Sequence, residues 1–185
     1  MAQIPQDKAK NFIGDFSATV YSVFRQQPVN INGFIVSDSI VLSTNDVMPQ
    51  SLISLVNTVQ AICKEEFSQN GILIRGAIAK GEFDDMPAKE LSNLQKRLIV
   101  GQGYVDAYLL ESSTKMIGIN LSKEVYCDLK NCDIYFDIME EKIEKNDHYI
   151  LRYITVDYLI DENNMRQFVK LASEANWLPH YYNAL

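Results

Sequence analysis

The chain has 185 residues, of which 47% are hydrophobic and 22% are charged, and its formal net charge is -7. This length and apolar content are enough for one sizeable core, so we expect a single domain over residues 1–185. The negative charge argues against nucleic acid or an anionic membrane surface as a partner, because both would repel the chain at long range. No apolar run approaches the roughly 18 residues of a membrane span and no secretory signal opens the chain, so we expect a cytoplasmic protein.

The cysteine pattern does not indicate a metal or redox site. Cys63, Cys127 and Cys132 are odd in number and form no CxxC pair, and only His148 and His180 could add imidazole ligands. We therefore expect structural or incidental thiols. A zinc site or a redox switch is the alternative.

The first third of the chain predicts a helix and then a hairpin. Apolar residues at four-residue spacing predict a helix over residues 6–26, and Pro28 helps to end it. Residues 29–43 are rich in β-branched and aromatic side chains on both sides of the turn formers Ser37, Asp38 and Ser39, which predicts two antiparallel strands. The apolar face of the helix consists of Phe12, Phe16, Val20 and Phe24.

The next segments predict a second helix, a strand and a loop. The helix is expected to start after Pro49 with Ser51 as its N-cap, and to stop at the Asn70-Gly71 pair. Residues 72–83 are short and apolar, which predicts a buried strand near the centre of a sheet. Residues 84–97 are polar and contain a proline, so we expect a loop there.

The second half of the chain alternates between strand and helix patterns. After the glycines of residues 101–103 we expect a short helix that reaches Glu111, and near the end a helix over residues 162–175 that buries Met165, Phe168, Val169 and Ala172. Between them, the patterns predict a strand over 115–120, a helix over 123–129, and strands over 134–138 and 148–159. Helices and strands are mixed, so the predicted class is α+β, with a mostly antiparallel sheet covered by helices.

Three blocks of this sequence, in their order and spacing, resemble a known enzyme family. Residues 33–43, 74–81 and 101–111 are similar to the catalytic domain of the class III nucleotide cyclases. The similarity is nearest to the short bacterial branch that includes the pyrimidine cyclases of antiphage signalling. It implies a ferredoxin-like sheet, conversion of a nucleoside triphosphate to a cyclic nucleotide and pyrophosphate, Mg²⁺ or Mn²⁺ as the cofactor, and a homodimer. The base remains open among ATP, GTP, CTP and UTP.

The first block supplies the expected metal and nucleotide contacts. Asp38 stands where the family carries a metal-binding aspartate at a hairpin tip, and a hard cation prefers such an oxygen ligand. The resemblance assigns Ser37 and the strand residues Asn32 and Phe34 to nucleotide binding. The alternatives are that the Ser-Asp-Ser turn only closes a hairpin and that the strand residues are ordinary strand residues.

The second and third blocks supply further candidates. Arg75 matches an Arg-Gly pair of the short branch, and its guanidinium is suited to clamp a phosphate or a base carbonyl. An ion pair with an acidic residue is the alternative. Gly103 opens a helix whose N-terminus is a place where backbone N–H groups can meet phosphate oxygens. Tyr108 offers a hydroxyl or a stacking face, although core packing is the commoner role of such an aromatic residue.

Two departures from the family pattern separate the possible functions. The family's first strand, with its own metal aspartate, has no counterpart here, and Asp15 belongs to the first predicted helix instead. Val105 and Leu109 stand where mainstream purine cyclases carry an asparagine and an arginine. One hypothesis is therefore an active nucleotide cyclase, and the second is a degenerate cyclase-like domain that binds a nucleotide or a protein. A third is an unrelated ferredoxin-like assembly domain.

Overall fold

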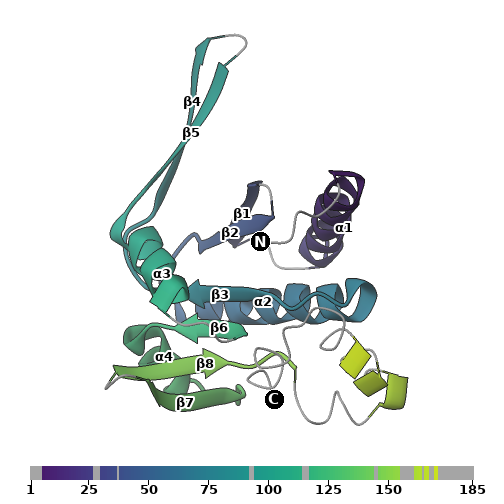
Figure 1. Cartoon of the computed structure of the whole chain (residues 1–185). Coiled ribbons are helices and arrows are strands. Elements are labelled where there is room, and N and C mark those ends of the chain that lie inside the picture. Colours follow the sequence, from purple (N-terminus) through teal and green to yellow (C-terminus); the bar gives the residue numbers. More distant parts are fainter. Residues whose placement is uncertain are drawn as a thin grey trace. The chain divides into compact units, whose positions relative to one another are not determined.

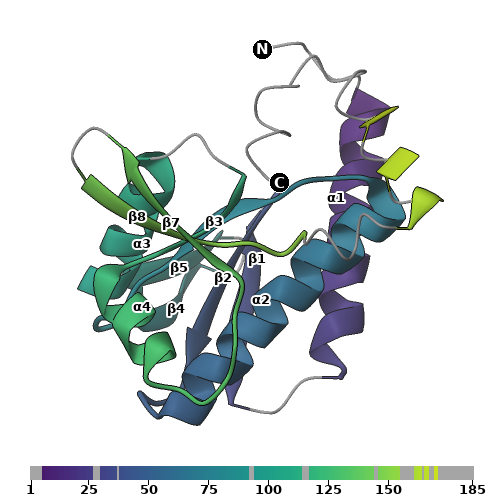
Figure 2. The ribbon, with the colours of Figure 1, turned by 90° about the horizontal axis from the view of Figure 1, so that it is seen from below.

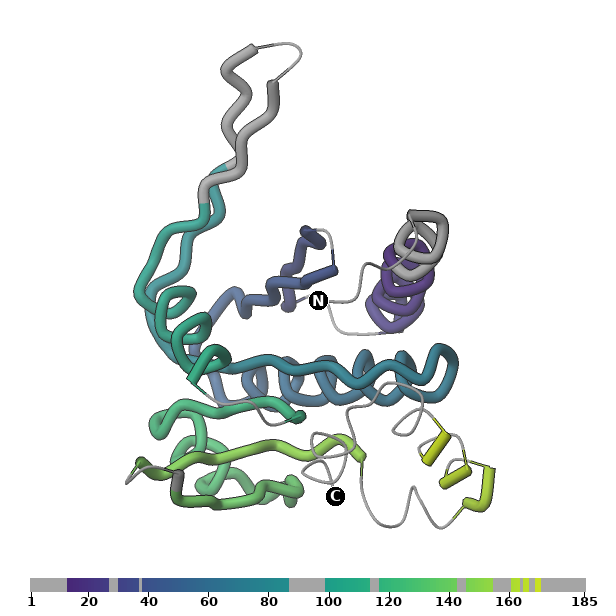
Figure 3. The backbone as a smooth tube through the Cα atoms, in the orientation of Figure 1, coloured from purple at the N-terminus to yellow at the C-terminus, as the bar shows by residue number. Residues whose placement is uncertain are grey.

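The chain forms two compact units in a computed structural model. One unit comprises residues 1–73 and 156–176, and the other comprises residues 74–155 and 177–185. The expectation of a single domain over residues 1–185 stays a prediction. The structure describes residues 6–26, 30–36, 38–91, 94–113, 117–143, 146–154, 161–163, 165–166 and 169–170 (Figure 3).

Two helices and a hairpin build the first unit. Helix α1 (Gln6–Phe24) and helix α2 (Pro49–Asn70) pack side by side (Figure 2). Strands β1 (Ile31–Val36) and β2 (Ser39–Thr44) lie between the helices in the sequence and pair antiparallel. The predicted first helix and the hairpin are both confirmed. Among the residues of α1 whose side chains the structure describes, the buried ones are Phe16, Thr19, Val20 and Val23.

A glycine lets the hairpin approach the first helix closely. A Cβ atom on Gly33 would lie 2.6 Å from Leu42 Cδ2 and 2.9 Å from Phe24 Cζ. A side chain at this position would therefore displace the ends of the Leu42 and Phe24 side chains. The face of β1 that carries Gly33 and the buried Ile31 packs inward, so the alternate residues point to the opposite face of the hairpin.

The start of α2 corrects one sequence-based prediction. Met48, not Ser51, is the N-cap residue, and it makes no capping hydrogen bond with its side chain. Ser51 lies inside the first turn, where its buried hydroxyl accepts a hydrogen bond of 2.9 Å from Asn30 Nδ2. Asp46 Oδ1 instead accepts the Met48 N–H at 2.9 Å. The predicted stop is confirmed, because Gly71 is left-handed with φ 69° and closes the helix.

A four-stranded sheet organises the second unit. Its order is β3-β6-β8-β7, with β3 (Arg75–Ile78) parallel to β6 (Gly118–Leu121) and the other pairs antiparallel. Strand β3 therefore lies at one edge of the described sheet, and the prediction of a central position is wrong for this sheet. Strand β7 (Ile138–Ile143) starts later than the strand predicted over residues 134–138. Strand β8 (Asn146–Leu151) starts earlier than the strand predicted over residues 148–159.

Two helices accompany this sheet. Helix α3 (Gln102–Ser113) contacts β3 and β6, and helix α4 (Lys123–Lys130) contacts β6. Ser122 caps α4 by accepting a hydrogen bond from the Val125 N–H, as expected for a serine N-cap. The rings of Tyr126 and Tyr149 stack with their centroids 3.9 Å apart, which attaches α4 to β8. Both helices are confirmed predictions.

A second hairpin replaces the loop expected at residues 84–97. Strands β4 (Asp84–Leu91) and β5 (Leu94–Val100) belong to the second unit and pair antiparallel as a two-stranded ribbon (Figure 1). The prediction relied on Pro87 and on the polar composition. A two-stranded ribbon tolerates both features, because each strand has one unpaired edge. A proline, which lacks the backbone N–H, can face that edge without loss of a hydrogen bond between the strands.

The end of the chain departs from the predicted burial. Residues 162–163, 165–166 and 169–170 are helical. Met165 and Val169 are 39% and 54% exposed, however, so they are not core residues as expected. Phe168, Ala172 and the aromatic residues of the last segment lie outside the described residues.

Candidate functional site

The tip of the first hairpin presents the expected carboxylate to solvent. The last paired residues are Val36 and Ser39, and the exposed Asp38 lies in the turn between them. Ser37 lies outside the described residues. The local sequence pattern was sufficient to predict this turn, because β-prone residues flank short polar turn formers. The hairpin thus holds Asp38 at the end of a paired ribbon, where both carboxylate oxygens can reach a ligand.

The strand leading to this tip places the predicted nucleotide residues on one face. Asn32 pairs in register with Ser43, and Phe34 pairs with Val41. Because strand side chains alternate, Asn32 and Phe34 share the face opposite to Gly33. Asn32 is exposed and donates a hydrogen bond through Nδ2 to Asn45 Oδ1, while Phe34 is half-buried. The hairpin therefore aligns these two side chains along the approach to Asp38.

A polar network fixes the other end of this hairpin. Asn30 bonds to Ser51, the Asn45 N–H donates to the Asn30 carbonyl at 3.2 Å, and Thr44 Oγ1 donates to the Asp46 carbonyl at 2.7 Å. Hydrogen bonds from the Ser51 hydroxyl and the Met48 N–H hold the pKa of Asp46 below its usual value. This network ties the hairpin to the start of α2. It was missed by sequence reasoning because asparagine and serine also occur in ordinary loops.

In the second unit, Arg75 forms an ion pair rather than standing alone. Its Nη2 atom lies 3.0 Å from Glu111 Oε1, and the two side chains are 46% and 29% exposed. The pair joins the first residue of β3 to the last part of α3. The acidic-partner alternative for Arg75 is thus present in the structure. A guanidinium has five N–H donors, so one carboxylate contact uses only part of its binding capacity.

The start of α3 is packed backbone against backbone. The Gly103 N–H donates a 3.1 Å hydrogen bond to the Glu82 carbonyl, so the predicted phosphate donor is engaged within the protein. A Cβ on Gly81 would lie 2.6 Å from the Gly103 nitrogen. Gly101 has φ 132°, and a Cβ there would lie 2.1 Å from the Glu82 oxygen. These three glycines are required by the close approach of two backbone segments.

The outer side of α3 carries large apolar side chains in solvent. Val105, Tyr108 and Leu109 are 45%, 62% and 59% exposed, and we refer to them as the α3 apolar face. Tyr108 is therefore not a core residue, although core packing is the commoner role of such an aromatic residue. A helix that is apolar on its exposed side is normally covered by another surface.

The acidic residues near the end of the chain have structural partners. Arg152 Nη2 lies 2.8 Å from Asp137 Oδ1, and the Arg152 N–H donates to the Asp137 carbonyl at 2.9 Å. Glu140 accepts a hydrogen bond from the Tyr126 hydroxyl and lies 3.2 Å from Lys130 Nζ. Both contacts lower the pKa of Glu140, the tyrosine most strongly. These pairs join residues that are far apart in the sequence, so no local pattern predicts them.

The described residues contain no cluster of metal-binding side chains. Within the described ranges, no three His, Cys, Asp or Glu side chains gather closely enough to hold a metal ion. All three cysteines are free thiols, and burial raises the pKa of Cys63, with a smaller contribution from Glu66. Glu66 is itself fully buried, and its carboxylate oxygens have no hydrogen-bond partner in this part of the chain. Among the helices that the structure describes, none is long and apolar enough to cross a bilayer.

The structure brings the sequence-predicted residues together in two groups. Asn32, Phe34 and Asp38 follow one strand and its turn in the first unit. In the second unit, Arg75 is joined to α3, the helix that carries Gly103 and Tyr108. The pairing of Arg75 with Glu111 carried no sequence signal, because the two residues belong to separate blocks.

Solved structures with a similar fold are nucleotide cyclases. The guanylyl cyclase Cya2 superposes with a TM-score of 0.56 at 10% sequence identity, covering 84% of this chain and 85% of that one. A bacterial light-regulated adenylyl cyclase gives a TM-score of 0.55 at 12% identity, covering 89% of this chain and 88% of that one. No protein-family model matches the sequence, and no curated protein matches it.

These similarities define the class of fold. The chain has a mixed α+β architecture like that of the adenylyl and guanylyl cyclases, which confirms the predicted fold class. At 10–12% identity the likeness concerns the fold alone. The activity has to be argued from the residues of this chain.

Proposed function

We propose that this chain is a nucleotide cyclase domain that converts a nucleoside triphosphate to a 3',5'-cyclic nucleotide and pyrophosphate. The observation that carries the proposal is the exposed carboxylate of Asp38 at a hairpin tip, within a fold shared with adenylyl and guanylyl cyclases. In this reaction the ribose 3'-hydroxyl attacks the α-phosphorus, the bond to the β-phosphate oxygen breaks, and pyrophosphate leaves. The hydroxyl proton passes to solvent.

In this proposal the hairpin binds the nucleotide and its metal. Asp38 holds the metal ion, while Ser37, Phe34 and Asn32 contact the nucleotide along the strand that leads to the tip. Phe34 offers a half-buried ring for the base, and Asn32 offers an amide that can donate and accept. Their common face on β1 supports this division of roles.

The proposal also gives roles to Arg75 and Tyr108. The guanidinium of Arg75 clamps a phosphate or a base carbonyl with the donors that Glu111 does not use. Tyr108 presents an exposed hydroxyl and ring to the substrate or to the second copy. Gly103 acts indirectly, because its N–H is bonded to Glu82 and its small size sets the position of α3.

Asp38 can hold Mg²⁺ or Mn²⁺ only if phosphate oxygens of the substrate supply further ligands to the ion. Such ions are commonly bound by one or two carboxylates plus phosphate oxygens, so Asp38 and a triphosphate can share the coordination. When bound, the ion lowers the pKa of the attacking hydroxyl and neutralises phosphate charge. The exposed position of Asp38 leaves room for this shared coordination.

The active form in this proposal is a homodimer. The α3 apolar face supports it, because three large apolar side chains on one exposed helix face need a covering surface. A second copy of the chain carries the same apolar face and can supply such a surface. The net charge of -7 makes nucleic acid an unfavourable partner.

The choice of base belongs to the same proposal. The Arg75-Gly76 pair and the Ala-Tyr-x-x-Glu pattern of residues 107–111 support the short bacterial branch, and with it a pyrimidine cyclase acting in antiphage signalling in the cytoplasm. An assay with all four nucleoside triphosphates tests the base preference together with the activity.

The decisive experiment uses the purified chain with Mn²⁺ and each nucleoside triphosphate in turn. We expect pyrophosphate and a cyclic nucleotide from at least one of them. The Asp38→Asn variant keeps the shape of the side chain but removes its charge, so its turnover should fall by about a hundredfold or more. Because Asp38 is exposed, the fold should be unchanged. Gln50→Asn, an exposed substitution on α2, serves as the control and should retain full activity.

The competing function is a degenerate cyclase-like domain that binds a nucleotide or a protein without turnover. Two observations favour it: Val105 and Leu109 offer no hydrogen-bond donors on α3, and Asp38 is the single metal ligand that can be assigned in the described chain. Measurable nucleotide binding with no pyrophosphate from any of the four substrates would replace the cyclase proposal with this one.

A further inference from the structure

One face of the first hairpin carries a pair of side-chain amides that are joined to each other. Asn32 pairs in register with Ser43, and Phe34 pairs with Val41. Asn45 follows Ser43 by two residues, so it lies on the same face as Asn32. The Asn32 Nδ2 atom donates a hydrogen bond to Asn45 Oδ1. The proposed function uses Asn32 and Phe34 but gives no role to Asn45.

The backbone of Asn45 is held in place by the start of the hairpin. Its N–H donates to the Asn30 carbonyl at 3.2 Å, which extends the strand pairing one residue beyond Thr44. The Asn30 side chain in turn donates to the buried hydroxyl of Ser51 at 2.9 Å. Asn45 therefore presents its amide to Asn32 from a position that α2 also supports.

The amide bond between the two side chains leaves a defined atom of Asn32 on the side of the hairpin tip. Asn45 lies on the side of Asn32 away from the turn at Asp38, and Phe34 lies two residues nearer to that turn. The oxygen and the nitrogen of a planar amide diverge from one carbon, so a nitrogen turned to Asn45 leaves the oxygen on the side of Phe34. A base that stacks on Phe34, about 7 Å along the strand, therefore meets a hydrogen-bond acceptor.

We propose that Asn45 is a positioning residue that turns the oxygen of Asn32 toward the base and so selects a base with an amino group on its pairing edge. This inference rests on the proposed function, in which Asn32 and Phe34 contact the nucleotide. Cytosine and adenine carry such an amino group, whereas uracil and hypoxanthine carry a carbonyl oxygen in its place. The ring N–H of these two bases is also a donor, but the carbonyl oxygen beside it repels the same acceptor. Among the pyrimidine nucleotides the substrate is therefore CTP rather than UTP.

Two pairs of nucleotides isolate this contact. CTP and UTP differ at position 4 and its neighbouring ring nitrogen, and ATP and ITP differ in the same way at position 6. Their 3'-deoxy forms lack the attacking hydroxyl, so binding can be measured without turnover. In calorimetric titrations of the full chain with Mn²⁺, the CTP form should bind about five to ten times more tightly than the UTP form, and the ATP form more tightly than the ITP form by a similar factor.

Two variants of the exposed Asn45 test its part in this preference. Asn45→Ala removes the partner, so the amide of Asn32 can turn either way and the preference should fall to within about twofold. Asn45→Asp accepts hydrogen bonds but cannot donate them, so it enforces the orientation of Asn32 and should keep the preference. The preference is a ratio of affinities, so the added charge acts on both members of a pair alike. A preference lost in Asn45→Asp, or kept in Asn45→Ala, would overturn the inference.

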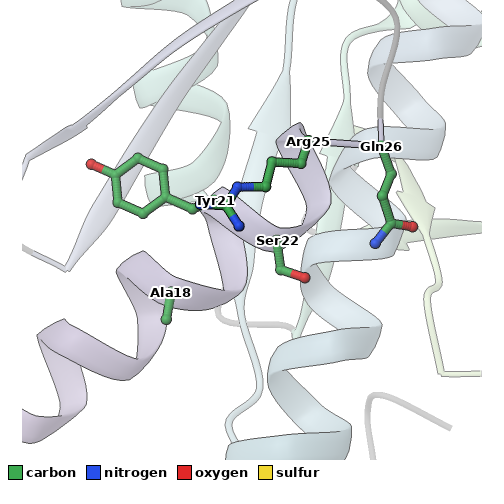
Figure 4. A pocket seen from close by; sticks show the side chains of 5 residues that line it. All are labelled: Ala18, Tyr21, Ser22, Arg25 and Gln26. Atoms are coloured by element: carbon green, nitrogen blue, oxygen red, sulfur yellow. The ribbon is translucent and has the colours of Figure 1, made fainter.

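A hollow beside α1 supplies the control, because it offers a triphosphate a different cation. The hollow has a volume of about 490 Å³ and is lined by Ala18, Tyr21, Ser22, Arg25 and Gln26 (Figure 4). None of these residues belongs to the hairpin, and Arg25 is exposed. Arg25→Gln should therefore leave the affinities and the preference unchanged within about twofold. A preference lost in this variant would place the nucleotide at α1 and would overturn the inference.

The outcomes separate this inference from the proposed function. Tighter binding of the amino bases without pyrophosphate from any of the natural nucleotides would support the inference and replace the cyclase with a nucleotide-binding domain. Turnover together with equal binding of the CTP and UTP forms would support the cyclase and overturn the inference. A chain that binds none of the four nucleotides would overturn both.

Discussion

Asp38 and Arg75 differ in how much of their surroundings a local sequence pattern defines. Asp38 lies in a turn whose flanking strands pair with each other, so its exposed position follows from neighbouring residues. Arg75 is positioned by its ion pair with Glu111, which lies on another element. The first residue could be assigned to a hairpin tip from the sequence. The second required the structure, because a contact between distant residues leaves no periodic signal.

The role of Arg75 can be separated from its ion pair by two variants. If the guanidinium clamps the nucleotide, Arg75→Ala should weaken nucleoside triphosphate binding about tenfold, because a charge-assisted contact is lost. Glu111→Gln removes only the acidic partner and should leave binding within about twofold. Both changes should alter the free energy of unfolding by less than about 1 kcal/mol, because the pair is partly exposed.

Isothermal titration calorimetry with each nucleotide, and chemical denaturation, measure the two effects. Equal losses of stability with unchanged nucleotide affinity in both variants would identify Arg75 as a structural partner of Glu111 and remove it from the site.

At the scale of the elements, the predictions succeeded where one face of an element is clearly apolar. Helix α1 buries Phe16 and Val20 as its spacing indicated, and α2 stops at Gly71 because glycine adopts the left-handed conformation there. The predictions failed where strand pairing stabilises a segment whose composition is unfavourable for a strand. Strand β4 contains Pro87 and several charges, yet it pairs along its length with β5. Strand β7 likewise contains Glu140, which packs at the sheet edge with Tyr126 and Lys130.

The junction between β5 and α3 should be sensitive to a single methyl group. Gly101→Ala places a Cβ 2.1 Å from the Glu82 oxygen and requires a residue other than glycine at φ 132°. We expect a loss of about 2–4 kcal/mol in the free energy of unfolding. Gly14→Ala is the matched control, because it lies in a helix with open space around it and should gain about 0.5–1 kcal/mol.

Urea denaturation followed by circular dichroism measures both changes. A Gly101→Ala variant as stable as the unaltered chain would show that this junction adapts easily. In that case the packing of Gly81 against Gly103 would not determine where α3 starts.

For the whole molecule, the arrangement of strands bears on the family resemblance. In the part of the chain that the structure describes, β1 and β2 form their own two-stranded sheet, and β3 has a neighbour on one side only. The expectation that the family's first strand has no counterpart in this sequence stays a prediction. Backbone N–H and C=O groups along such open edges are able to pair with another strand. The same absence removes one of the two expected metal ligands, so the proposed activity rests on Asp38.

The proposed dimer makes a prediction for the whole molecule through the α3 apolar face. Leu109 is 59% exposed, so Leu109→Glu should leave the fold intact while placing a charge in the centre of a buried interface. An unpaired charge in such a place costs several kcal/mol, and the dimer constant should weaken by about a hundredfold or more. Gln50→Glu adds the same charge at an exposed position of α2 and should leave both dimer and activity unchanged.

Sedimentation velocity and the pyrophosphate assay should then change together. If the active site needs two copies, Leu109→Glu loses turnover at low protein concentration and regains part of it at high concentration, because mass action restores the dimer. Full activity in a monomeric Leu109→Glu chain would show that one copy carries a complete site, and the α3 apolar face would then need a different partner.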